Sequence, residues 1–165
     1  MSTSPKDRQI VERLIETSGP DETRGAGRIL GASLAGGEVV LLHGPLGAGK
    51  TLFARGIADA LGVVRWRGSP TFTLINEYSS TPRLIHLDLY RLQGDDVEDL
   101  GLDEYVSPTN VCLVEWPERA GDYLRHLPTT RILDVDIAIT GADTRSIAIE
   151  EQQHDRRRAR SEGGE

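Results

Sequence analysis

The feature that most constrains this chain is a glycine-rich loop that joins an apolar run to an amphipathic segment. The sequence Gly44-Pro-Leu-Gly-Ala-Gly-Lys-Thr51 fits the phosphate-binding loop (P-loop) pattern. The run from Glu38 to His43 is typical of a buried parallel strand, and Thr51 to Leu61 places apolar side chains at helical spacing. A strand, a P-loop and a helix in this order predict a nucleotide-binding α/β fold.

The residue types of the loop suit the binding of phosphate groups. Glycines at 44, 47 and 49 allow the backbone angles that turn successive N–H groups toward one anion, and the helix that follows presents its positive end to it. Lys50 supplies a point charge for the outer phosphates, and the Thr51 hydroxyl can ligate Mg²⁺. The predicted nucleotide contacts here are Gly44, Leu46, Gly47, Ala48, Gly49, Lys50, Thr51 and Leu52.

A magnesium site also needs a carboxylate at the end of a neighbouring strand. Two apolar runs end in an acid, one at Asp88 and the other at Glu115, and their spacing does not choose between them. His86 would share the strand face of Asp88, but no third ligand follows at metal-binding spacing. We therefore expect neither a zinc site nor a serine triad.

The remaining patterns predict one α/β domain over residues 1–150 with a mixed, mostly parallel sheet flanked by helices. Ser18 resembles a helix N-cap, and Gly36 follows the predicted helix. That helix spans Asp21 to Ala35. Strands are expected at Gln9 to Thr17, Thr71 to Ile75, Leu84 to Leu89 and Val111 to Glu115, with an edge hairpin from Leu133 to Ile149. Residues 151–165 lack large apolar side chains and predict a disordered tail.

Composition restricts the function classes. The net charge of −7 and a pI near 5.1 argue against nucleic-acid binding by this chain alone. Cys112 lies within an apolar run and is expected in the core. It is the one cysteine of the sequence, so a disulfide framework is excluded. No apolar run approaches the roughly 18 residues of a membrane helix, and the first residues lack a signal-peptide core. We expect a cytoplasmic protein without a membrane partner.

Four motifs follow one another along the chain. They are Leu46-Gly-Ala-Gly-Lys-Thr51, Ser69-Pro-Thr-Phe-Thr-Leu74, His86-Leu-Asp-Leu-Tyr-Arg-Leu92 and Glu115-Trp-Pro117. In this order they resemble the bacterial TsaE family, also called YjeE, the ATPases of tRNA threonylcarbamoyladenosine (t6A) biosynthesis. The resemblance covers roughly residues 18–117, and four ordered motifs are far more specific than a P-loop alone.

The resemblance implies roles that spacing does not assign. It implies that Glu115 helps to hold Mg²⁺, that Asp88 lies near the metal and the γ-phosphate, and that Thr71 belongs to a switch-like segment. Ser18 and Thr23 match a segment that contacts the nucleotide base, although helix capping explains Ser18 equally well. Trp116 either packs against the nucleotide or fills the core.

The resemblance also implies a P-loop fold, ATP and Mg²⁺ as cofactors, and TsaB and TsaD as partners. Through that complex the chain would meet tRNA only indirectly, with TsaD performing the transfer chemistry. We expect slow ATP hydrolysis by the chain alone and faster turnover with the partners.

Two other functions fit the same loop. A small-molecule or nucleoside kinase would pass the γ-phosphate to an organic acceptor, whereas an ATPase releases it to water. A nucleotide-dependent interaction module would bind ATP without turnover and thereby order a docking surface. The acidic segment from Gly94 to Val106 is either a solvated helix and loop or such a docking face.

Overall fold

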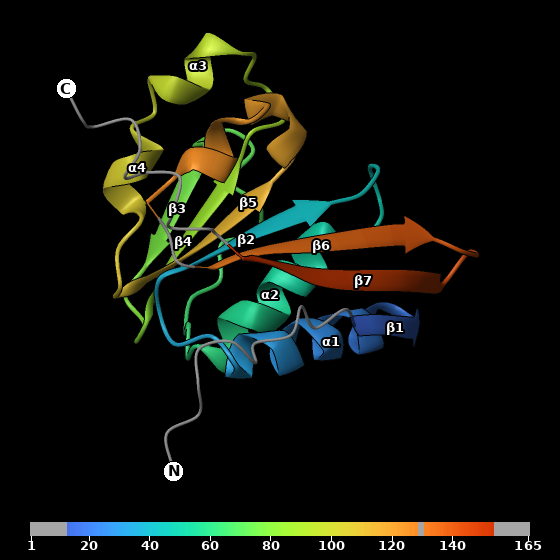
Figure 1. Cartoon of the computed structure of the whole chain (residues 1–165). Helices are drawn as coiled ribbons and strands as arrows, with labels where there is room; N and C mark the ends of the chain where they lie inside the picture. The colour runs from blue at the N-terminus through green and yellow to red at the C-terminus, as the bar shows by residue number, and fades with distance from the viewer. Residues whose placement is uncertain (1–12, 129–130, 154–165) are drawn as a thin grey trace, which may run out of the picture.

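Seven strands form one mixed sheet in the order β1-β7-β6-β2-β5-β4-β3 (Figure 1). The structure is a computed structural model that describes residues 13–128 and 131–153. The strands are β1 (Arg13–Ser18), β2 (Glu38–His43), β3 (Ile75–Tyr78), β4 (Arg83–Asp88), β5 (Asn110–Glu115), β6 (Arg131–Ile139) and β7 (Thr144–Gln153). Parallel ladders join β6, β2, β5 and β4 at the centre, and antiparallel ladders add β7, β1 and β3 at the margins. The expected mixed α/β sheet is thus confirmed, but it is not mostly parallel, because three ladders are parallel and three are antiparallel.

The helices cover both faces of this sheet. The two long helices, α1 (Pro20–Ala32) and α2 (Lys50–Ala60), pack together on one face (Figure 1). The other face carries α3 (Asp95–Glu98), α4 (Leu102–Tyr105) and the 3₁₀ helices η1 (Pro117–Ala120) and η2 (Tyr123–His126).

Strand β2 shows how the sequence produces two hydrophobic cores. Successive side chains of a strand point to opposite faces. Val40 and Leu42 therefore join the core beneath α1 and α2, while Val39 and Leu41 join the core beneath the short helices. All four are almost fully buried, which is why the run reads as continuously apolar. Cys112 is buried as expected, and burial raises the pKa of its thiol to about 12.

Helices α1 and α2 contact each other through their backbones. A Cβ atom on Gly27 would lie 2.1 Å from the carbonyl oxygen of Phe53, and one on Gly56 would lie 2.0 Å from that of Arg24. Any side chain at these positions would push the helices apart. The Arg24 guanidinium also pairs with Asp59 across the same contact, with Nε 2.6 Å from Oδ2.

Several predicted boundaries are wrong. Ser18 does not cap α1, because it ends β1 and the N-cap is Gly19, whose φ of 106° suits glycine. The Glu22 carboxylate instead accepts a hydrogen bond from the Ser18 backbone N–H. Helix α1 also ends at Ala32, before the predicted Ala35.

The strand predicted at 71–75 lies further along the chain, because residues 71–73 form a turn and β3 begins at Ile75. The hairpin of β6 and β7 forms, but β1 pairs with β7, so β7 is not an edge strand. The predicted tail begins too early, since β7 continues through residue 153. Residues 154–165 and the first part of the strand predicted at 9–17 lie outside the described residues.

The acidic segment at 94–106 forms α3 and α4, which bury Val97 and Leu102. Its acids are exposed, as the solvated interpretation expects. Over the described ranges, no helix combines the length and apolar character needed to cross a membrane.

Candidate functional site

The P-loop connects β2 to α2 at the carboxyl edge of the sheet. Gly47 and Gly49 have φ values of 79° and 106°, angles that other residues rarely adopt. Gly49 is the N-cap of α2, and Lys50 is the first helical residue. The positive end of this helix, with its free backbone N–H groups, therefore faces the same space as the lysine.

The side chain of Lys50 folds back into the loop. Its ammonium donates hydrogen bonds to the carbonyl oxygens of Gly44 and Pro45, and it lies 3.6 Å from the ring centroid of Trp116. Lys50 is only 6% exposed, and burial lowers its pKa despite the opposing attraction of Glu115, Glu118 and Asp88. The lysine is thus held at the site by neutral acceptors that a phosphate can replace.

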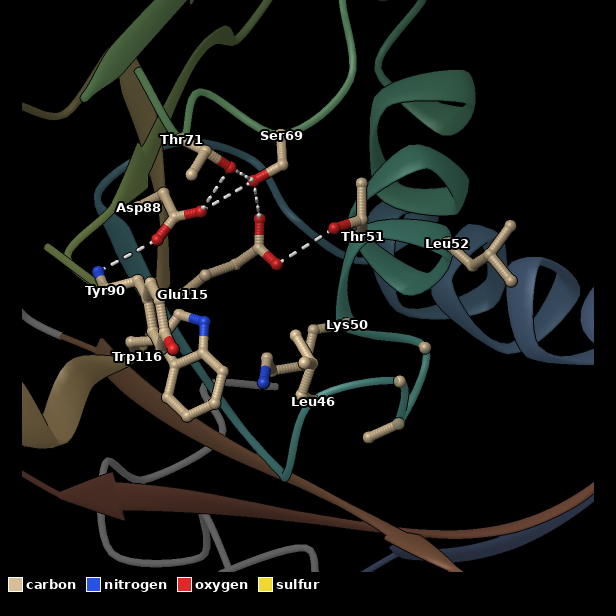
Figure 2. Close-up of a pocket in the computed structure, with 13 residues that line it drawn as sticks. Leu46, Lys50, Thr51, Leu52, Ser69, Thr71, Asp88, Tyr90, Glu115 and Trp116 are labelled. Carbon is tan, nitrogen blue, oxygen red and sulfur yellow. Dashed lines mark hydrogen bonds between the residues drawn. The ribbon is translucent and has the colours of Figure 1, made fainter. Parts of the chain in front are cut away.

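Two buried carboxylates face the loop. Asp88 ends β4 and Glu115 ends β5, and the parallel register places them side by side. The Thr51 hydroxyl donates to Oε1 of Glu115 at 3.0 Å (Figure 2). The Ser69 hydroxyl lies 2.7 Å from Oδ2 of Asp88 and 3.2 Å from Oε2 of Glu115, and so joins the two acids.

Both oxygens of each carboxylate have partners. The Thr71 hydroxyl lies 3.2 Å from Oδ2 of Asp88, and the backbone N–H of Tyr90 donates to Oδ1 at 2.9 Å. Oε2 of Glu115 lies 2.7 Å from Nε2 of His86, a fully buried imidazole stacked on another ring. These contacts fix the orientation of both acids.

These groups surround one cavity of about 460 Å³ (Figure 2). We call residues 46–52 the phosphate wall, and Ser69, Thr71, Asp88 and Glu115 the acidic wall. Trp116 and Tyr90 form a third side, with ring centroids 4.9 Å apart. The cavity brings together most of the residues predicted from sequence, namely Leu46, Gly47, Ala48, Gly49, Lys50, Thr51, Leu52, Thr71, Asp88, Glu115 and Trp116.

Three predicted residues do not line the cavity. Gly44 packs against β6 instead, where a Cβ atom on it would be 2.7 Å from the carbonyl oxygen of Ile137. Thr23 is buried, and its hydroxyl lies 2.9 Å from that of Thr17. Ser18 is exposed at the end of β1. The base contact predicted for Ser18 and Thr23 stays a prediction.

Ser69 and Tyr90 line the cavity although the sequence did not single them out. Both lie within the quoted motifs, so motif membership was the available signal. The contact between His86 and Glu115 was also missed, because it joins two strands across the sheet. Among the described residues, no group of three or more His, Cys, Asp and Glu side chains is placed to hold a metal ion. The expectation that His86 is not a metal ligand stays a prediction.

Two residues beside the site have backbone angles that non-glycine residues rarely adopt. Leu74 has a φ of 67°, and Trp116, which follows Glu115, has a φ of 57°. Such conformations cost about 1–3 kcal/mol and cluster at functional sites. The angle at Trp116 accompanies the placement of its ring beside Lys50.

The two acids of the acidic wall, together with Thr51 of the phosphate wall, fit a hard cation. Thr51, Asp88 and Glu115 offer only oxygen atoms, which magnesium prefers. Magnesium is usually held by one or two carboxylates together with substrate phosphates and water. Two carboxylates opposite a phosphate wall match that arrangement.

Comparison with known proteins identifies relatives along most of the chain. The sequence model of the family "Threonylcarbamoyl adenosine biosynthesis protein TsaE" matches residues 17–153. The tRNA threonylcarbamoyladenosine biosynthesis protein TsaE of Bacillus subtilis is 44% identical over 79% of this chain and 80% of that protein. Its counterpart in Treponema pallidum is 41% identical over 74% of this chain and 91% of that protein. The crystal structure of Bacillus subtilis YdiB superimposes with a TM-score of 0.71, 34% identity and 93% coverage of each chain.

Proposed function

Because this chain belongs to the TsaE family of tRNA threonylcarbamoyladenosine biosynthesis, we propose that it is a Mg²⁺-dependent ATPase that acts in t6A formation with TsaB and TsaD. In this proposal it works in the cytoplasm and meets tRNA only through the complex. The observation that carries the ATPase assignment is one cavity in which a phosphate wall faces two buried carboxylates. Ser69 joins these carboxylates to each other, and Thr51 joins Glu115 to the phosphate wall.

The phosphate wall would bind the phosphate chain of ATP. The N-terminal end of α2 and the Lys50 ammonium carry the positive charge, and the carbonyls of Gly44 and Pro45 hold that ammonium until phosphate oxygens replace them. The ring of Trp116 beside Lys50 closes this side of the cavity.

Thr51 and Glu115 would hold Mg²⁺, with Asp88 reaching it directly or through a bound water. The metal, when bound, neutralises charge on the transferring phosphoryl group. Ser69 and Thr71 hold the Asp88 carboxylate in one orientation. The acidic wall would thereby orient a water for attack on the γ-phosphate.

Partner activation follows from what the cavity lacks. None of the residues that line it in the described structure is an arginine, and an arginine that stabilises the transition state can contribute 10³–10⁵-fold in rate. TsaB or TsaD could supply this charge or order the segment from Ser69 to Leu74. The isolated chain should therefore hydrolyse ATP slowly. The net charge of −7 fits a division of labour in which partners hold the tRNA.

The test is an ATPase assay of the purified chain alone, of TsaB with TsaD, and of the three proteins together. We expect release of inorganic phosphate that needs Mg²⁺ and that rises when all three are mixed. Phosphate found on an organic acceptor would favour the kinase alternative. Tight ATP binding without turnover in any mixture would favour the interaction module. Fast turnover by the chain alone, unchanged by the partners, would contradict the proposed activation.

A further inference from the structure

An arginine contacts the P-loop from outside the cavity. Arg145 lies near the start of β7, and its Nε donates to the carbonyl oxygen of Ala48 at 2.9 Å. Its Nη2 donates to the carbonyl oxygen of Gly47 at 3.2 Å. The remaining nitrogen, Nη1, binds carbonyl oxygens of its own hairpin, at 3.1 Å for Gly141 and 2.8 Å for Thr144. One guanidinium thus ties the β6–β7 hairpin to the phosphate wall.

These bonds constrain which way the loop presents its N–H groups. A peptide unit is planar and trans, so its carbonyl and its N–H point in opposite directions. The carbonyl of Ala48 shares a peptide unit with the N–H of Gly49. Gly49 lines the cavity and Arg145 does not. A carbonyl held outward by Arg145 therefore keeps the Gly49 N–H turned away from the arginine, on the side of the cavity.

The positive charge of Arg145 is not neutralised nearby. Among residues 13–128 and 131–153 no carboxylate forms an ion pair with it, and the acceptors described for it are backbone carbonyls. By contrast, Arg24 and Arg125 each pair with an aspartate. The half-buried guanidinium of Arg145 therefore adds positive potential behind the loop, which the surrounding water screens in part.

We propose that Arg145 is a positioning residue for phosphate binding, which fixes the carbonyls of Gly47 and Ala48 outward and adds positive charge to the anion site. This inference rests on the proposed binding of ATP at the P-loop. The hairpin that carries Arg145 is itself held, because the backbone N–H of Gly19 donates to the carbonyl oxygen of Asp143 at 2.6 Å.

Two substitutions separate geometry from charge. Arg145→Lys keeps the charge but lacks the planar fork that reaches two loop carbonyls and the hairpin together. Arg145→Met removes both and keeps an unbranched apolar stem. Thr140→Ala is the matched control, because the Thr140 hydroxyl bonds that of Thr144 at 2.9 Å within the same hairpin and does not contact the loop.

The experiment is calorimetric titration of ATP and of inorganic tripolyphosphate into the full chain and each variant, with thermal melting of the unliganded proteins. We expect Arg145→Met to weaken both ligands by a similar factor, roughly tenfold or more, because two charge-assisted bonds to the loop are lost. Arg145→Lys should fall between the wild type and Arg145→Met. Thr140→Ala should bind both ligands within about twofold of the wild type.

The outcomes separate this inference from the proposed function. If the wild type binds neither ligand, the proposed ATP site is wrong and this inference falls with it. If the wild type binds and the folded Arg145→Met binds equally well, only the role of Arg145 is overturned. Equal weakening by Thr140→Ala and Arg145→Met would mean that the arginine acts only through hairpin stability. If Arg145→Met does not fold, the test rests on Arg145→Lys. A folded Arg145→Lys that binds both ligands as tightly as the wild type would overturn the proposed role of the guanidinium.

Discussion

The two walls of the cavity differ in how the chain builds them. The phosphate wall is one contiguous segment, and it acts through backbone N–H groups, a helix terminus and a single ammonium. The acidic wall is assembled from the segment at 69–71 and from the ends of β4 and β5, and it acts through side-chain oxygens bonded to one another. The first wall is positive and the second is negative.

In the proposed ATPase, this difference gives the two walls different tasks. A positive wall stabilises the phosphate groups of bound nucleotide in the ground state, so its loss should appear as lost affinity. A negative wall repels phosphate unless a cation lies between them, so its loss should appear as lost turnover with binding largely kept. Substitutions can test this division one wall at a time.

The largest effect on ATP affinity is expected for Lys50→Ala. Loss of the one ammonium on the phosphate wall should weaken ATP binding by about 100-fold, because bonds to charged groups contribute about 1.5–3 kcal/mol. Titration of nucleotide measures it, with melting to show that the fold is intact. The control is Arg55→Ala, which removes an exposed charge from the same helix. Unchanged affinity in folded Lys50→Ala would remove the P-loop assignment.

Glu115→Ala should lower turnover while leaving ATP binding largely intact. We expect kcat in the activated complex to fall by roughly 100-fold, because an acid that holds the metal stabilises charge in the transition state. Affinity for ATP without Mg²⁺ should stay the same or rise, since a negative charge opposite the phosphates is gone. Asp88→Ala should show a related defect. The control is Glu150→Gln, which removes an exposed carboxylate of β7 outside the cavity. Normal rates in both wall variants would refute the metal site.

A smaller effect is expected for Ser69→Ala. The Ser69 hydroxyl bonds to both acids and is not itself one of the proposed ligands of the metal, so kcat should fall by about tenfold with ATP affinity unchanged. Steady-state rates and nucleotide titration measure the two quantities. Ser79→Ala, at an exposed serine outside this cavity, is the control. A loss of affinity as large as that of Lys50→Ala would show that the two walls are not separate in function.

The smallest effect is expected for His43, which lies just before the P-loop. His43 precedes Gly44, and its Nε2 lies 2.7 Å from Oδ1 of Asp134. This bond raises the pKa of His43 above its ordinary 6.5, despite the opposing effect of burial. The charged pair therefore stabilises the fold below about pH 6.5, and this contribution is lost as pH rises through the raised pKa.

The free energy of unfolding of the wild type should fall between pH 6 and 9 as His43 loses its proton. In His43→Gln this fall should be smaller, by at most about 1 kcal/mol. Urea unfolding of both proteins across that range measures the difference. Asp134 keeps its two bonds to Arg125 in the variant, which limits the effect. A larger slope in His43→Gln than in the wild type would contradict the assigned sign.

The sequence predicted the phosphate wall better than the acidic wall, for a physical reason. Residues 44–52 carry their signal in consecutive positions, because the loop forms from local backbone geometry. Asp88 and Glu115 were also found, since each ends an apolar run, but their hydrogen bonds to Ser69 join segments far apart in the chain. Residues 71–73 form a turn although their residue types favour extended structure, so the predicted strand begins too early. The positive φ of Leu74 cannot be predicted from its residue type. Arg145 was missed because its partners are backbone carbonyls, which the residue types do not reveal.

The close contact of α1 and α2 at Gly27 and Gly56 has a consequence for the order of folding. Both helices lie between residues 20 and 60, so their contact closes a short loop and costs little chain entropy. The parallel ladders of β2 require β5 and β6, which follow much later. We therefore expect the helix pair to form early and to fix the start of α2. The phosphate wall would then take shape before the acidic wall. A side chain at Gly56 should therefore reduce the rate of folding more than it reduces the affinity of the folded protein for nucleotide.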